Sequence, residues 1–125
     1  MSFGIKMKLS GPRVLLPLEG LCVLVAASLV YRAGGYGWWK FVVFFFAPDL
    51  AIIGYVMSAT IGATIYNAVH TYVAVGALWL LGRLLGVASV SPICLIWLAH
   101  IGLDRLLGYG LKYPSGFKDT HLGRV

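Results

Sequence analysis

Four long runs of apolar residues, separated by short polar segments, form the main pattern of the chain. They cover residues 14–31, 38–55, 60–81 and 87–107. Each is close to the roughly 20 residues that a helix needs to cross a hydrocarbon core of about 30 Å. Because backbone groups in lipid must be satisfied within the segment, the runs are predicted to be helices. The prediction is an all-α fold: a four-helix transmembrane bundle forming one domain, residues 1–125, with a polar tail at 112–125.

Two features interrupt this pattern. The sequence Pro48-Asp49 lies inside the second run, so that helix is expected to kink or restart there. Glu19 lies inside the first run, which is also long for the apolar part of a signal peptide. We therefore interpret the first run as a retained helix rather than a cleaved leader.

The composition fits a membrane protein. The chain is 60% hydrophobic and only 11% charged, with a formal net charge of +6. These values argue against a disordered chain, a coiled coil and an ordinary soluble enzyme. The basic residues lie at the ends of the apolar runs, so they indicate topology and contact with membrane lipids rather than with nucleic acid. Lys6, Lys8 and the basic tail predict that both termini face the cytoplasm, in a multi-pass protein of the inner (cell) membrane of a bacterium.

Five ionisable residues lie inside the predicted spans, where charge is costly and usually faces the interior. At a rise of ~1.5 Å per residue, all five fall in the cytoplasmic half of the bundle. We therefore expect them to meet in one polar site. They are Glu19, Asp49, His70, His100 and Asp104.

The spacing of His100 and Asp104 suggests a metal site. Residues four apart share one helix face, and an imidazole beside a carboxylate suits zinc, manganese or iron. The alternative is a hydrogen bond by which Asp104 orients His100, or an ion pair between Asp104 and Arg105.

The other polar positions each allow a functional and a structural interpretation. Asn67 and His70, three apart, could bind a substrate and a metal, or simply hold helices together. Asp49 could line a cavity at the helix break, or cap the restarted helix. Glu19 could be an acid/base, or a surface charge paired with Arg13 or Arg105.

The tail contains Phe117 and His121 in an otherwise polar segment. We expect the tail to fold back and cap the site, with His121 as a lid contact. The alternative is a free terminus.

These residues lead to a functional hypothesis, although no known catalytic signature is present. We expect a membrane-embedded, metal-dependent hydrolase-like enzyme acting on a lipid-like substrate. His70, His100 and Asp104 would hold a divalent metal, zinc first, with Asp49 as a further candidate ligand; the catalytic residues would be Glu19, Asp49, Asn67 and His121. The alternatives are an oligomeric proton-coupled carrier and a non-catalytic structural subunit, and a homo-oligomer is compatible with each.

Several segments carry a family resemblance. They include Ala47-Pro48-Asp49-Leu50, residues 66–72 (YNAVHTY), residues 97–105 (WLAHIGLDR) and the closing runs 108–114 and 116–123. From Leu18 onward the chain resembles a family of small bacterial membrane proteins, the domain-of-unknown-function family 4260. The resemblance implies a four-span membrane protein and supplies no activity.

Overall fold

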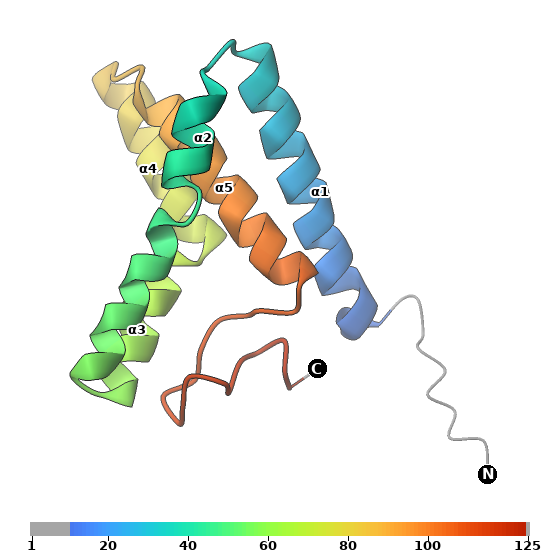
Figure 1. The fold of residues 1–125 in the computed structure, drawn as a ribbon, viewed down its shortest axis with the longest axis vertical. Helices are drawn as coiled ribbons and strands as arrows, with labels where there is room; N and C mark the ends of the chain where they lie inside the picture. Colours follow the sequence, from blue (N-terminus) through green and yellow to red (C-terminus); the bar gives the residue numbers. More distant parts are fainter. Residues whose placement is uncertain (1–10, 125) are drawn as a thin grey trace.

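The computed structural model describes residues 11–124, so Lys6 and Lys8 lie outside the described part. Within it the fold is all-helical, with no β-strand; one isolated antiparallel bridge joins Lys112 and Thr120. Five α-helices and one 3₁₀ helix follow one another along the chain (Figure 1). They are α1 (Pro12–Ala33), α2 (Trp38–Phe44), η1 (Ala47–Val56), α3 (Ala59–Val69), α4 (Tyr72–Leu85) and α5 (Val90–Leu106).

Helix α5 is the central element of the fold. It packs against α1 and α4, while α3 packs against η1 (Figure 1). The contact with α1 is close because both helices carry a glycine where they meet: a Cβ on Gly102 would lie 2.7 Å from the Gly20 carbonyl oxygen. Small residues allow membrane helices to approach in this way. The contact fixes which face of α1 looks toward α5.

The second apolar run is interrupted where the sequence predicts it. Helix α2 ends at Phe44, and the 3₁₀ helix η1 begins at Ala47 with Pro48 in its first turn. Proline has no amide hydrogen, so it suits the start of a helix better than its interior. As a result Asp49 lies in the first turn of η1.

The third apolar run differs from the expectation of one helix over residues 60–81. It breaks at His70–Thr71 into α3 and α4, which are bent by 49° relative to each other. Thr71 caps α4, since its hydroxyl accepts from the Val73 amide at 3.4 Å. Hydropathy gives no sign of the break because both halves are apolar. α4 then continues to Leu85, beyond the predicted end.

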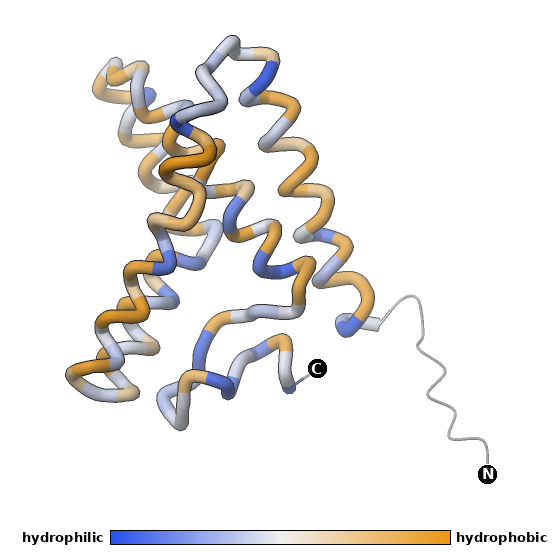
Figure 2. The backbone as a smooth tube through the Cα atoms, in the orientation of Figure 1, coloured by the Kyte–Doolittle hydropathy of each residue, from blue (hydrophilic) through white to orange (hydrophobic). Residues whose placement is uncertain are grey.

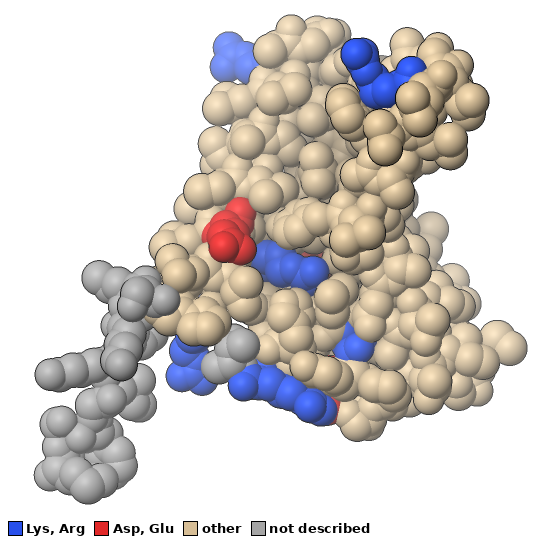
Figure 3. Space-filling model, turned by 180° about the vertical axis from the view of Figure 1, so that it is seen from behind, with Lys and Arg blue, Asp and Glu red and all other residues tan. Residues whose placement is uncertain are grey.

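Part of the chain has the length and apolar surface that a membrane span requires. Two segments are long and apolar enough to cross a membrane, Pro12–Ala33 and Trp38–Val56, and a third is reached if α3 and α4 form one bent span. Helix α5 has 17 residues and is largely buried. Hydrophobic positions cover the helices, whereas the tail is mostly hydrophilic (Figure 2). On the face shown in Figure 3, basic side chains lie at the two ends, and between them an acidic patch adjoins a basic one within an otherwise uncharged surface.

Candidate metal centre

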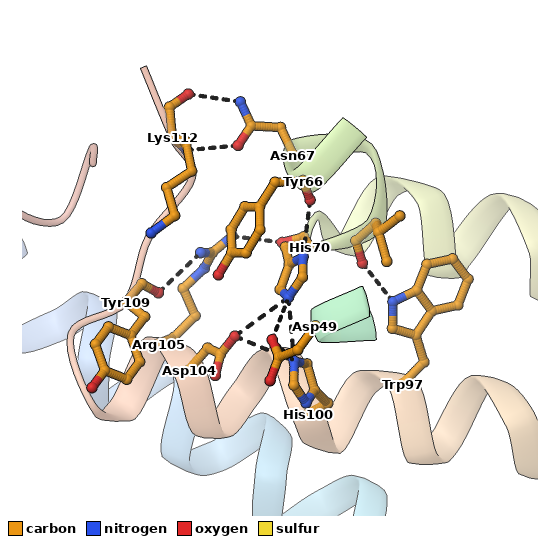
Figure 4. A network of polar contacts seen from close by, with 11 residues as sticks. Asp49, Tyr66, Asn67, His70, Trp97, His100, Asp104, Arg105, Tyr109 and Lys112 are labelled. Atoms are coloured by element: carbon orange, nitrogen blue, oxygen red, sulfur yellow. Dashed lines mark hydrogen bonds and ion pairs between the residues drawn. The ribbon is translucent and has the colours of Figure 1, made fainter. Parts of the chain in front are cut away.

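Four side chains from three separate elements meet in the middle of the fold. Asp49 comes from η1, His70 from the end of α3, and His100 and Asp104 from α5 (Figure 4). Both histidines are 1% exposed, whereas 38% of the Asp49 side chain is accessible and 14% of that of Asp104. The centre is therefore buried on its imidazole side and open on the side of Asp49.

The distances within this cluster suit a metal ion. The Nε2 atoms of His70 and His100 are 3.2 Å apart, and each lies 3.2 Å from Asp49 Oδ1. Asp104 Oδ2 lies 3.6 Å from His70 Nε2 and 3.3 Å from His100 Nε2. A tetrahedron around zinc with bonds of about 2.0–2.1 Å has edges of about 3.3–3.4 Å. Five of the six separations are therefore close to tetrahedral edges, and all four atoms lie within 4.8 Å of one another, which is close enough to surround one small cation.

The contacts of His70 direct its Nε2 lone pair toward the cluster. Its Nδ1 lies 2.9 Å from the Tyr66 carbonyl oxygen, which can only accept, so Nδ1 carries the hydrogen. In the neutral ring Nε2 is then free to bind a metal. The Tyr66 ring also stacks on the His70 ring, with centroids 3.7 Å apart and planes inclined by 6°. Such fixing of the second nitrogen is typical of metal-bound histidines.

His100 and Asp104 share one face of α5, as their spacing predicts. Nδ1 of His100 is buried and has no hydrogen-bond partner within residues 11–124. The rings of Phe45 and Phe46 approach His100 edge-on, with centroids at 5.5 and 6.2 Å. Apolar packing therefore fixes this imidazole, and its Nε2 is the atom that reaches polar partners.

Asp104 does not form the ion pair with Arg105 considered above, among the residues that the structure describes. The buried Arg105 guanidinium donates instead to the carbonyl oxygens of His70, at 3.0 Å, and Tyr109, at 3.3 Å. Asp104 is thus left facing the two imidazoles. Two carboxylates and two neutral imidazoles together carry a formal charge of −2, which one divalent cation would neutralise.

The side chain of Asn67 forms hydrogen bonds with the C-terminal tail. Its Nδ2 donates to the Lys112 carbonyl oxygen at 2.7 Å, and its Oδ1 accepts from the Lys112 amide at 2.6 Å (Figure 4). Both ends of the Asn67 amide are therefore used to hold the chain after α5 against α3. In this arrangement Asn67 positions the tail and does not reach the cluster.

Glu19 and His121 also lie outside the cluster. Glu19 is exposed on α1 and makes no hydrogen bond or ion pair with any residue in 11–124. His121 is half-buried, and its Nδ1 accepts a hydrogen bond from the Leu111 amide at 2.7 Å, so this contact joins two parts of the tail to each other. Burial and the positive charge of Arg105 keep the pKa of His121 below its ordinary value. The tail does fold back onto α3, through Lys112 rather than His121.

Two residues support the cluster through contacts that were not predicted from the sequence. Trp97 Nε1 donates to the Val69 carbonyl at 2.5 Å, and Arg105 donates to that of His70. These are the carbonyls left free where α3 ends. The sequence does indicate a structural role for Arg105, because a charged residue inside an apolar run needs polar partners. It gives no such indication for Trp97, since an indole in a membrane helix is ordinarily a packing or interfacial residue.

Comparison with known proteins yields one finding. Searches of curated proteins and of solved structures return no match. The family model described as "Domain of unknown function (DUF4260)" matches residues 13–125, which is nearly the whole chain. This range contains all four residues of the cluster. The chain therefore belongs to the DUF4260 family.

Proposed function

We propose that the cluster of Asp49, His70, His100 and Asp104 binds a divalent metal ion, with zinc as the leading candidate. The observation that carries the proposal is that four atoms that can all be ligands lie within 4.8 Å of one another, with five of their six separations at 3.2–3.6 Å. When both imidazoles present the Nε2 lone pair, these lone pairs and the carboxylate charges face each other at these distances unless a cation lies between them; the alternative is a hydrogen bond from His100 Nε2 to Asp104. Imidazole and carboxylate ligands together are typical of zinc, and iron and manganese bind similar sets.

We further propose that the metal centre lies within a bundle of four membrane spans, the fourth being α5. The start of α1 and the tail lie at the same end of the bundle (Figure 1), which agrees with an even number of spans. Arg13, Lys112, Lys118 and Arg124 belong to these segments. The positive-inside tendency then puts both termini in the cytoplasm, in the inner membrane of a bacterium.

The proposed reaction is hydrolysis of a lipid-like ester or phosphoester. A divalent metal lowers the pKa of a bound water and polarises the bond to be cleaved. The oxygen of water would bond to the carbonyl carbon or phosphorus, the bond to the leaving oxygen would break, and a proton from water would end on that oxygen. Asp49 is the most accessible of the four residues, so it is the carboxylate placed to take up and return this proton.

An apolar cavity beside the cluster supports a lipid-like substrate. Its volume is about 330 Å³. Two of its lining residues, Pro48 and Val69, directly precede Asp49 and His70 in the sequence. A hydrocarbon chain in this cavity would hold its polar end near the metal ligands. The cavity is lined by Phe44, Ala47, Pro48, Val69, Ile93, Ile96 and Trp97.

A structural metal site is the second candidate, and one observation favours it. Four protein ligands can fill a tetrahedron, whereas catalytic zinc sites keep a position open. The catalytic proposal therefore requires expansion to five ligands or displacement of Asp49. Its accessible carboxylate makes Asp49 the residue whose replacement separates the two candidates.

Metal analysis of the detergent-purified protein tests the proposal. We expect one zinc per chain in the wild type, little in His100→Ala, and a full complement in His121→Ala, which removes a histidine outside the cluster. Equal zinc content in all three proteins, or none in the wild type, would refute the metal centre.

Hydrolysis is then tested with p-nitrophenyl octanoate and an octyl p-nitrophenyl phosphate diester. A catalytic centre predicts zinc-dependent release of p-nitrophenol that falls at least about 100-fold in Asp49→Asn, since general acid–base catalysis contributes about 10²–10⁴-fold. A structural site predicts no turnover in the wild type and a lower melting temperature after chelation.

A further inference from the structure

The Lys112 side chain is buried although it belongs to the C-terminal tail. The residue is 6% exposed, and its backbone is fixed by Asn67 on one side and by the bridge to Thr120 on the other. Within residues 11–124 its ammonium forms no hydrogen bond and no ion pair. Lysine is almost never fully buried unless it is paired. The position of Lys112 therefore calls for an explanation.

Two aromatic rings flank the ammonium group of Lys112. Nζ lies 3.9 Å from the centroid of Phe117 and 4.8 Å from that of Tyr66. Ring faces attract a cation but cannot satisfy three N–H donors as oxygen atoms would. Nζ is not one of the fully buried unpaired atoms of residues 11–124, and Phe117 is 42% exposed, so an anionic group from outside the chain can reach the ammonium in the cage between the two rings.

The cage is connected to the metal centre through Tyr66. The same ring that faces Nζ stacks on His70 at 3.7 Å. Asp49 and Asp104 are near enough to stabilise the charged form of Lys112, although burial has the larger effect and lowers its pKa. In Figure 4, Lys112 lies on one side of the cluster and Trp97 on the other.

Trp97 also lines the apolar cavity, so the cluster lies between a region that suits a hydrocarbon chain and a cation that lacks an anion. A ligand that satisfied both would be amphiphilic and negatively charged. Its anionic group would have to lie near the metal ligands and within reach of Nζ.

From this arrangement we infer that Lys112 recognises the anionic group of the substrate, and that the substrate is a phosphate ester carrying an apolar chain. The inference rests on the proposed function and narrows its substrate class from any lipid-like ester to an anionic one. Lys112 is a binding residue in this scheme, and the reaction at the metal remains the one given above.

The test uses zinc-loaded full-length protein in detergent and three probes. These are dioctanoyl phosphatidic acid, dioctanoylglycerol, which has the same chains without phosphate, and inorganic phosphate. Calorimetry is expected to show that wild-type protein binds phosphatidic acid at least tenfold more tightly than either other probe. Lys112→Met should remove this preference, whereas Lys118→Met, which removes an exposed lysine of the same tail, should keep it.

Three outcomes would overturn the inference. Lys112→Met could bind phosphatidic acid as tightly as the wild type does, the wild type could bind the neutral lipid equally well, or free phosphate could bind as tightly as the lipid. If Lys112→Met lowers the melting temperature, Lys112→Gln and Lys112→Arg serve instead. The first should lose the preference and the second, which retains the charge, should keep it.

The zinc content of every sample separates this inference from the metal proposal. A Lys112-dependent preference for phosphatidic acid in protein that holds no zinc would refute the metal centre and keep the anion site. Full zinc content without that preference would refute the anion site and keep the metal centre.

Discussion

Replacing Trp97 by Phe tests whether α5 fixes the helix end that bears His70. The substitution keeps an aromatic ring but removes the N–H that lies 2.5 Å from the Val69 carbonyl. An unpaired buried acceptor costs about 1–3 kcal/mol in soluble proteins, and interhelical hydrogen bonds in membranes average about 0.6 with a maximum near 1.7 kcal/mol. We expect a loss of about 1–1.7 kcal/mol, the upper part of the membrane range, because this carbonyl ends a helix and has no amide partner.

The assay is reversible unfolding in mixed micelles, together with zinc titration. Trp79→Phe is the control, since Trp79 is 46% exposed and its indole donates to no residue in 11–124. If His70 is held by this helix end, Trp97→Phe also weakens zinc binding, whereas Trp79→Phe leaves stability and zinc affinity unchanged. Equal stability of the two variants would show that the Trp97 hydrogen bond does not fix the break.

Two further predictions concern the α1–α5 contact and the tail. Gly102→Ala should lower the free energy of unfolding by about 1–3 kcal/mol, because its Cβ would lie 2.7 Å from the Gly20 carbonyl oxygen. Gly76→Ala, where nothing lies within 4 Å, should not, and an equal loss in both variants would refute the reasoning. The second prediction is that the tail loosens on mild acidification. The docked tail favours neutral His121, so this contribution is complete above about pH 6.5 and declines as the pH falls toward the lowered pKa of the docked state. The protection factor of the Leu111 amide against hydrogen exchange should therefore fall as the pH is lowered from 7.5 to 5.5, and a constant value would contradict this. Over the same range Asp119, with a pKa of about 2, stays charged and keeps its contacts with Ser115 and Arg124.

The parts of the site that follow from local spacing could be predicted from the sequence. The four-residue separation of His100 and Asp104 places both on one face of a helix, and Pro48 places Asp49 at a helix start. The meeting of Asp49, His70 and the α5 pair was inferred only from similar depth along the spans. The depth of a residue along a span does not determine which way its side chain faces. Glu19, which was predicted to join the cluster from its depth but lies outside it, is an example.

The orientation of α1 explains why Glu19 lies outside the cluster. The buried residues of α1 are Gly20, Ala27 and Tyr31, which are seven and four residues apart and so form one stripe. Adjacent residues on a helix point about 100° apart, because one turn takes 3.6 residues. With Gly20 turned toward α5, Glu19 points about 100° to the side of that direction, outside the stripe that contacts α5. The spacing of the small residues Gly20 and Ala27 indicates which face of α1 packs against α5, whereas the depth of a residue along the span does not.

The helix break at His70 could not be read from the sequence because the contacts that stabilise it come from another helix. In an unbroken helix the carbonyls of Val69 and His70 would accept from the amides of Val73 and Ala74. In the structure Thr71 takes the Val73 amide, while Trp97 and Arg105 supply the two replacement donors. These two helical hydrogen bonds are therefore each exchanged for one to α5. The exchange ties the end of α3 to the helix that carries His100 and Asp104, so the contacts that bend the chain also bring the two imidazoles together.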